Sequence, residues 1–371
     1  TTIAHKIYHD PMGMSHFHLR AWCSISQVYH KKNLFLEILT CILPNIFFNK
    51  TEEELAEEIY KCLKRNRYLI VLDDIWDIEA WNELQASFPN DANGSRVIKT
   101  SRLHDVAPQD KLDKEPHCLR QLTHDESWDL LKEKLFPGKD LPPKLCELRT
   151  QIVEMCQGLP LTIVILAGIL AHTDQYGWKE VVQRLSSSAI SSSEQCKAAL
   201  ELSYTNLPEN LKPCFLYFGA YPQDHEHITD RLTWLWVAEG FVQKTQFKSS
   251  EDVAYDYLMD LIGRSLVMVP KQRSIGGVKT CRIHDLLHDF CVRKAQEENF
   301  LHLVRGYDEL STCYVPPNLH RLCINCEPEH FCKLRLYSPT IRSLLVFARA
   351  EVHPRTWSFD LSFISCIFKL V

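Results

Sequence analysis

The sequence predicts an α/β domain with a parallel sheet, followed by a helical bundle, a domain of helices with one β-hairpin, and a short repeat-like segment. Tyr68–Trp76 is an apolar run that contains two adjacent carboxylates near its end, which is typical of a strand buried on both faces of a sheet. Strands alternate with helices around this run, which indicates a parallel, doubly wound sheet. Beyond Leu119 the strand pattern stops and the composition becomes helical.

The composition is that of an ordinary globular protein. With 371 residues, 45% of them hydrophobic, the chain is long enough for roughly two to four domains. The formal net charge of -5 gives no electrostatic reason to expect a nucleic acid or an anionic membrane as partner. Fifteen scattered cysteines without a secretory signal favour reduced thiols. The longest apolar run, Leu159–Ala171, is too short to cross a bilayer, so we expect no transmembrane segment and a cytoplasmic location with peripheral-membrane or nuclear pools.

The first domain, residues 1–119, reads as alternating strands and helices. Thr51 and Glu54 form a capping box that opens a helix directly before the strand with the aspartates. The elements expected here are a strand at Phe17–Ile25, a helix at Asn33–Leu43, a helix from Thr51 to about Asn66, a helix at Ile78–Phe88 and a strand at Arg96–Thr100.

Two further domains follow. Residues 120–195 begin with a second capping box, Thr123 to Glu126, and continue with helices on both sides of Gly158–Pro160, which together form a helical bundle. Residues 196–305 combine helices with a β-hairpin, a combination that describes a winged-helix domain. Its expected elements are helices around Ala198–Tyr204, Arg231–Phe241 and Val253–Ile262, and strands at Leu266–Val269 and Val278–Ile283.

The last segment, residues 306–371, contains one apolar pattern twice. Leu319–Ile324 and Ile341–Val346 both have the L-x-x-L-x-L spacing of leucine-rich repeats. Because a solenoid needs several repeats for stability, we interpret the segment as the start of an array that continues elsewhere.

Asp73 and Asp74 lie near the end of the buried run, at the edge of the sheet where ligands of open α/β sheets bind. Two neighbouring carboxylates suit a nucleoside triphosphate site, in which the first holds Mg²⁺ and the second polarises an attacking water or faces the γ-phosphate. Alternatively, the pair only caps the following helix. The strand by itself leaves both interpretations open.

The chain begins with Thr1 and Thr2 and has neither an initial methionine nor a helix cap, so we expect it to start inside a helix. In the phosphate-loop pattern G-x-x-x-x-G-K-[ST], the two threonines fit directly after the lysine. We therefore expect the glycines and the lysine of such a loop to lie upstream of this chain.

Five segments now stand in a fixed order: Tyr68–Trp76, Gly94–Arg102, Gly158–Leu161, Cys214–Pro222 and Arg282–Phe290. Together they resemble the NB-ARC module of plant intracellular immune receptors. The resemblance is strongest to the coiled-coil class and, within it, to the late-blight resistance group of the nightshade family. It spans nearly the whole chain, and it implies an incomplete P-loop NTPase domain, a helical bundle (ARC1), a winged-helix domain (ARC2) and the start of a leucine-rich repeat solenoid.

The resemblance also implies roles for the residues at the strand ends. Asp73 would be the Mg²⁺-associated aspartate, and Thr1, beside Thr2 in the nucleotide-binding segment, would present its hydroxyl to the metal. Asp74 would be the catalytic acid. Arg102 would sense the γ-phosphate, because a guanidinium grips phosphate in a planar, bidentate way. The alternative for Arg102 is a surface arginine that ends a strand.

Two later motifs complete the implied site. Gly158, Leu159 and Pro160 match the segment that contacts adenine, although a proline at this place can also just start a helix. His284 matches the histidine of the Met-His-Asp motif, which reaches the β-phosphate of ADP and ties the winged helix to the nucleotide domain. Imidazole suits that role because it donates a hydrogen bond and can carry charge near neutral pH. Ile283 replaces the methionine, a volume-conserving change.

The function that this resemblance implies is an ADP/ATP-binding, Mg²⁺-dependent switch of an immune receptor. A pathogen effector or a guarded host protein would trigger exchange of ADP for ATP, self-oligomerisation and hypersensitive cell death, with ATP hydrolysis slow at most. No substrate pocket for a metabolic ATPase is evident in the sequence. The alternative is a degenerate or truncated receptor fragment that binds no nucleotide and acts only as an interaction module.

Two other functions were weighed. A winged helix can bind DNA, but between Asp230 and Phe300 ten Lys or Arg residues balance ten Asp or Glu residues, whereas a DNA reader is basic. A C-x-x-C pair can bind zinc, but these cysteines alternate with apolar residues of the first repeat-like strand, where small buried cysteines are usual. The candidate zinc ligands are Cys323, Cys326, His320, His330 and Cys332.

Overall fold

The computed structural model describes residues 1–25, 29, 31–43, 50–103, 116–139, 141–186, 192–243, 247–274, 276–304, 319–324 and 340–347. They form two compact units, Thr1–Cys118 and Leu119–Phe347, and each unit has its own hydrophobic core. In the part of the chain that is described, no helix combines the length and the apolar character needed to cross a membrane.

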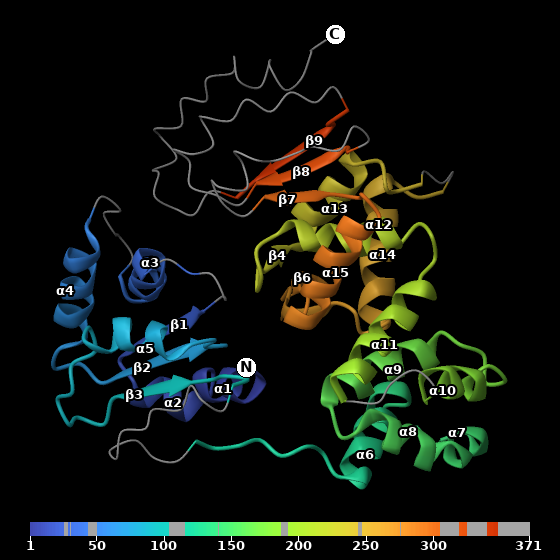
Figure 1. Ribbon diagram of the computed structural model, residues 1–371, viewed down its shortest axis with the longest axis horizontal. Coiled ribbons are helices and arrows are strands. Elements are labelled where there is room, and N and C mark those ends of the chain that lie inside the picture. The colour runs from blue at the N-terminus through green and yellow to red at the C-terminus, as the bar shows by residue number, and fades with distance from the viewer. Residues whose placement is uncertain are drawn as a thin grey trace. The chain divides into compact units, whose positions relative to one another are not determined.

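The first unit is a three-stranded parallel sheet with the order β1-β2-β3. Figure 1 shows α3, α4 and α5 on one side of this sheet and α1 and α2 on the other, as in a doubly wound fold. The strands are β1 (Leu19–Ser24), β2 (Tyr68–Asp73) and β3 (Arg96–Lys99). The helices are α1 (Thr2–Tyr8), α2 (Pro11–His16), α3 (Lys31–Ile42), α4 (Glu52–Leu63) and α5 (Ile78–Gln85).

The central strand β2 is buried along its whole length, as its continuous apolar sequence predicts. The helix that precedes β2, α4, begins with the predicted capping box. The Thr51 hydroxyl accepts the backbone N–H of Glu54 at 3.3 Å, and the Glu54 carboxylate accepts that of Thr51 at 2.8 Å. In the register of the sheet Asp73 lies opposite Ser24, so the strand ends meet at one edge.

The second unit begins with the predicted helical bundle. Its central helix α9 is apolar all round and nearly fully buried, as expected for a helix enclosed by others. Gly168 lets α9 approach the winged-helix domain closely, since a Cβ there would lie 2.0 Å from the Arg264 carbonyl oxygen. The helices are α6 (His124–Leu135), α7 (Pro143–Glu147), α8 (Arg149–Cys156), α9 (Pro160–Ala171), α10 (Trp178–Ser186) and α11 (Ser192–Thr205).

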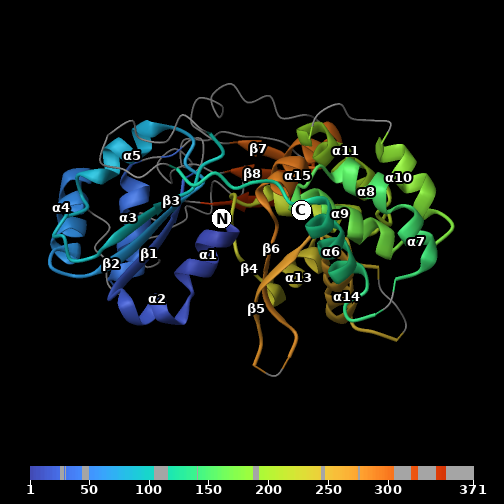
Figure 2. The ribbon, with the colours of Figure 1, turned by 90° about the horizontal axis from the view of Figure 1, so that it is seen from below.

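The winged-helix part contains the expected hairpin, β5 (Met268–Gln272) with β6 (Val278–Arg282). A short strand that the sequence did not predict, β4 (His227–Ile228), pairs with β6, so the sheet order is β4-β6-β5. Figure 2 shows the hairpin extending away from the helices. The helical elements are α12 (Lys212–Leu216), the 3-10 helix η2 (Tyr217–Ala220), α13 (Thr229–Ala238), α14 (Ser250–Gly263) and α15 (Asp285–Glu297).

The two repeat-like segments form neighbouring parallel strands. β7 (His302–Val304), β8 (Arg321–Ile324) and β9 (Ser343–Val346) make a sheet of that order. Leu322 pairs with Leu344, so equivalent positions of the two segments lie side by side. This register is the one that stacked repeats require.

An arginine fastens this sheet to the winged-helix part. Arg321 Nε donates to Glu239 Oε2 at 2.7 Å, and the Glu239 side chain is only 8% exposed. The guanidinium carbon lies 4.7 Å from the ring centre of Phe241 and 4.5 Å from that of Phe300. The charge pair is thus enclosed by aromatic rings.

A cluster of aromatic side chains surrounds His227 near the same sheet. The ring of His227 contacts Phe218, Tyr221 and His225 at centroid distances of 4.9, 4.3 and 4.7 Å. Burial lowers the pKa of His227 from 6.5 to about 3, and the neighbouring imidazoles of His225 and His288 contribute to this lowering. His227 is therefore neutral in the folded protein at physiological pH.

The stability of the second unit should decrease as the pH falls below 6.5. In the unfolded chain His227 gains a proton near pH 6.5, whereas in the folded chain it does so only near pH 3. The unfolded state then binds more protons, so the free energy of unfolding falls by about 1.4 kcal/mol per pH unit. Urea unfolding followed by circular dichroism between about pH 7.5 and 5.5 measures this slope.

Two variants test whether His227 causes this slope. His227→Phe keeps an aromatic ring in the cluster and should reduce the slope without abolishing it, because burial also lowers the pKa of His225. Replacement of the exposed His124 by Gln should leave the slope unchanged. Equal slopes for His227→Phe and the unsubstituted chain would contradict the assignment.

Candidate functional site

The end of β2 carries a buried carboxylate. Asp73 is 2% exposed and closes the strand. The Thr100 hydroxyl donates to Asp73 Oδ1 at 2.5 Å, and the amino nitrogen of Thr1 lies 3.5 Å from the same oxygen. The predicted partners Thr1 and Asp73 are therefore neighbours within the first unit.

Asp74 lies beside Asp73 in an unusual backbone conformation. Its φ is 58°, in the left-handed region that non-glycine residues rarely adopt. Its N–H donates to Thr100 Oγ1 at 2.9 Å. Its carboxylate accepts two bonds from Arg102, from Nε at 2.9 Å and from Nη2 at 2.7 Å. This bidentate pairing is the geometry in which a guanidinium binds carboxylate or phosphate.

Arg102 is held from a second side by an indole. Its guanidinium carbon lies 4.9 Å from the ring centre of Trp76. The Arg102 side chain is 37% exposed, whereas that of Asp74 is 12% exposed. Arg102 is thus paired with the Asp74 carboxylate and remains partly open to solvent.

The idea that the two aspartates cap the following helix is wrong. Asp77 is the N-cap of α5, and its carboxylate accepts the backbone N–H of Ala80 at 2.8 Å. Asp73 and Asp74 precede that cap, and their described contacts are with Thr1, Thr100 and Arg102.

The groups at this edge fit a hard divalent cation. Mg²⁺ prefers oxygen ligands and usually keeps several waters, and a carboxylate with a neighbouring threonine suits it. The residues that would hold it are Asp73 and Thr1. Among the described residues there is no group of three or more His, Cys, Asp or Glu that could hold a metal, so water and phosphate oxygens would have to complete the coordination.

Thr2 is the first residue of α1, and Thr1 is its N-cap without a side-chain capping bond. The Thr1 hydroxyl is thus not used to cap the helix. The contacts of Thr100 with the aspartates and of Trp76 with Arg102 were not predicted from the sequence. Thr100 could have been found, because it follows β3 directly and β3 pairs in parallel with β2. Neighbouring parallel strands end at the same edge of a sheet, so a hydroxyl residue there can reach the aspartates.

The Gly158 segment forms a tight turn between α8 and α9 in the second unit. Gln157 and Gly158 both have positive φ, 48° and 68°. The Gly158 carbonyl accepts the N–H of Leu122 at 3.0 Å. Pro160 is the first residue of α9, with Leu159 as N-cap, so the helix-starting role of this proline is realised.

His284 caps helix α15 in the same unit. Its Nδ1 accepts the backbone N–H of Leu286 at 3.2 Å. An accepting Nδ1 carries no proton, so in the neutral ring the proton is on Nε2. The ring thus has a defined tautomer, with Nε2–H as a donor at the N-terminus of a 13-residue helix.

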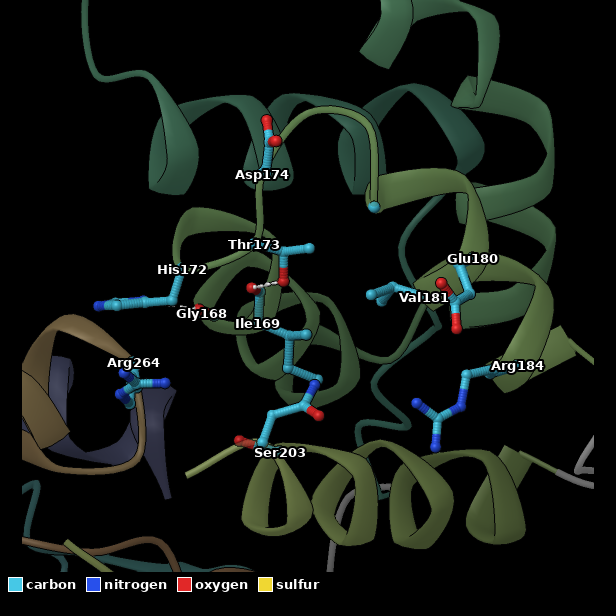
Figure 3. A pocket seen from close by; sticks show the side chains of 12 residues that line it. Gly168, Ile169, His172, Thr173, Asp174, Glu180, Val181, Arg184, Ser203 and Arg264 are labelled. Atoms are coloured by element: carbon cyan, nitrogen blue, oxygen red, sulfur yellow. Dashed lines mark hydrogen bonds between the residues drawn. The ribbon is translucent and has the colours of Figure 1, made fainter. Parts of the chain in front are cut away.

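A groove of about 410 Å³ in the second unit is lined by none of these residues. Figure 3 shows Arg264 across from His172 and Gly168 on one side of it. The polar side chains there interact with one another. The Asp260 carboxylate accepts a hydrogen bond from Arg264 Nε at 2.7 Å and lies 3.5 Å from His172 Nε2. The groove thus marks the seam between the bundle and α14.

The zinc candidates have other contacts where they are described. Cys323 is buried and its thiol donates to the Ala220 carbonyl at 2.6 Å. His320 Nδ1 lies 3.0 Å from the Thr340 carbonyl oxygen. Cys326, His330 and Cys332 are outside the described residues.

Comparison with known proteins gives two family matches. Residues 1–141 match the model of the NB-ARC domain, and residues 220–291 match that of the disease resistance protein winged helix domain. The two segments contain the strand-end carboxylates and His284, respectively.

The similar proteins include two putative late blight resistance protein homologs from Solanum demissum. One is 42% identical over 81% of this chain and 23% of its own length. The other is 41% identical over 84% of this chain and 24% of its own length. Among solved structures, a signal transduction ATPase with numerous domains from Pyrococcus horikoshii aligns with a TM-score of 0.45 and 18% identity, over 75% of this chain and 37% of its own.

These findings define an NB-ARC nucleotide-binding module followed by a winged helix. The chain belongs with the NB-ARC disease resistance proteins and is a homologue of the late blight resistance proteins. It spans about a quarter of the length of the curated relatives it matches.

The turn at Gly158 should not tolerate a side chain. A Cβ at Gly158 would lie 2.4 Å from the Leu122 carbonyl oxygen, and the positive φ adds strain. Gly158→Ala should therefore lower the free energy of unfolding of the second unit by roughly 2–4 kcal/mol in urea titration. Gly138, with φ of 67° and open space around it, is the matched control. Gly138→Ala should cost only about 1 kcal/mol, and equal losses would refute the steric argument.

Proposed function

We propose that this chain is the ADP/ATP-binding switch region of a plant intracellular immune receptor. The observation that carries the proposal is the convergence of Asp73, Asp74 and Arg102 at the carboxyl edge of a parallel sheet, with Thr1 beside Asp73. The NB-ARC match over these residues supports it. Slow ATP hydrolysis, with Asp74 as the catalytic acid, would reset the switch.

Arg102 would read the number of phosphates. Its two donors now bind the Asp74 carboxylate, and a γ-phosphate offers a competing anion of similar bidentate geometry. With ADP the guanidinium would stay on Asp74, and with ATP it would transfer to the phosphate. Because the two states differ in one strong charge contact, nucleotide identity would bias the conformation.

Asp73 and Thr1 would hold Mg²⁺. When bound, the metal supplies positive charge that offsets the phosphates. The burial of Asp73 keeps its carboxylate in one orientation, and the Thr100 bond removes its rotational freedom. These residues thus prepare the edge of the sheet for a polyphosphate before it arrives.

Pro160 and His284 would contact the rest of ADP. The proline ring is a rigid apolar surface for adenine. His284 Nε2–H would donate to the β-phosphate, and the N-terminus of α15 adds partial positive charge. ADP would thereby link the nucleotide domain, the bundle and the winged helix in the resting receptor.

Activation would follow from loss of that link. A pathogen effector or guarded host protein, recognised through the leucine-rich repeats that β8 and β9 begin, would release ADP and admit ATP. Self-oligomerisation and hypersensitive cell death would then follow in the cytoplasm. The competing proposal is a receptor fragment that binds no nucleotide and serves only as an interaction module.

Calorimetric titration tests nucleotide binding and the role of Arg102 together. A receptor that carries this region directly after a complete phosphate loop should bind ADP and a non-hydrolysable ATP analogue in the presence of Mg²⁺. Arg102→Ala should weaken binding of the ATP analogue by about tenfold or more, because a charged hydrogen bond is lost, and should change ADP affinity by less than about twofold.

Arg96→Ala is the matched control at the other end of β3. Arg96 is exposed, and its described side-chain bond is to the carbonyl of its neighbour Ser95. It should leave both affinities unchanged. Absence of any ADP binding by the unsubstituted receptor with its phosphate loop complete would refute the switch and favour the interaction-module alternative.

Replacement of His284 should weaken ADP retention. His284→Val removes both the helix cap and the Nε2 donor, whereas His284→Asn keeps a good cap and removes only the phosphate donor. Both should speed ADP release and, in a receptor expressed in leaves, cause cell death without a pathogen. Only His284→Val should also lose about 1 kcal/mol of stability. Normal ADP release from both variants would count against the role.

A further inference from the structure

The ends of β2 and β3 are joined residue by residue. Thr100 binds both aspartates, Ser101 Oγ donates to the Ile75 carbonyl at 2.7 Å, and the Ile75 N–H donates to the Thr100 carbonyl at 2.8 Å. The residues that follow β3 therefore fix the conformation of the chain that leaves β2. Of the two hydroxyls, that of Thr100 is bonded to the Asp73 carboxylate and to the backbone N–H of Asp74.

The Thr100 hydroxyl uses its donor and its acceptor on different residues. Its hydrogen goes to Asp73 Oδ1, since the carboxylate can only accept, and its oxygen takes the N–H of Asp74. The bond to Asp73 is 2.5 Å long, in the range of charge-assisted O–H···O⁻ bonds. A single oxygen thus orients the first carboxylate and anchors the backbone of the second.

The second contact matters because the Asp74 backbone is strained. A left-handed φ of 58° in a non-glycine residue persists only when the surrounding structure enforces it. The N–H bond to Thr100 and the Ile75 bond to the Thr100 carbonyl enforce it from both sides. This turn directs the Asp74 carboxylate toward Arg102.

We propose that Thr100 is the positioning residue of the metal and phosphate site. Its hydroxyl binds the Asp73 carboxylate, which would hold Mg²⁺, and the backbone of Asp74, which binds Arg102, so Thr100 would act on the site through these two residues. This inference rests on the proposed nucleotide switch. Residues that orient metal ligands typically contribute about 10- to 100-fold to metal affinity or activity.

The test compares ADP affinity with Mg²⁺ and with EDTA for three variants of a receptor that carries this region after a complete phosphate loop. Thr100→Val keeps the shape and removes the hydroxyl, and Thr100→Ala removes it without risk of a clash. Both should weaken Mg²⁺-dependent ADP binding by about tenfold or more and change the affinity in EDTA by less than about twofold. Thr100→Ser keeps the hydroxyl and should retain Mg²⁺-dependent binding near that of the unsubstituted chain.

Ser101→Ala is the control, because Ser101 binds a backbone carbonyl and not a carboxylate. It should leave the ratio of the two affinities unchanged. A normal ratio in both Thr100→Val and Thr100→Ala overturns the inference, and so does an equal loss with and without Mg²⁺, which would mean a merely structural role. Failure of the proposed function looks different, since the unsubstituted receptor, with its phosphate loop complete, would then bind ADP in neither condition.

Discussion

Two adjacent carboxylates at the end of a fully buried strand are the constraint on which the first unit depends. A buried charge without partners costs several kcal/mol, so the neighbouring strand must supply donors. It does so through the hydroxyl of Thr100 and the guanidinium of Arg102. The parallel register that brings these residues to the same edge is therefore a condition for burying Asp73 and Asp74 at all.

In the second unit, two residues combine a structural role with the chemistry of a nucleotide contact. Pro160 and His284 each start a helix, and each also has the chemistry expected of a nucleotide contact. In His284 the two roles are physically linked, because accepting the capping bond at Nδ1 puts the ring proton on Nε2. The secondary structure thus defines the donor.

Local sequence signals predicted most of the fold. The capping boxes at Thr51 and Thr123 involve residues three apart in the chain, and β2 is recognisable by its apolar run. The sequence could not predict that Asp77 rather than Asp74 caps α5, or that Thr100 binds both aspartates. These contacts depend on the backbone turn after β2 and on the distances between strands. Neither can be predicted from the spacing of residues in the sequence. Likewise, nothing in the pattern of β8 predicted the partners of Arg321.

The enclosed pair of Arg321 and Glu239 makes the joint between the repeat-like sheet and the winged helix cooperative. A small displacement of β8 would leave a carboxylate that is only 8% exposed without its counter-ion and Phe241 and Phe300 without the cation between them. Intermediate separations are therefore unfavourable, and the joint resists gradual bending. Separation of β8 from the winged helix would therefore require the ion pair and both ring contacts to be lost together.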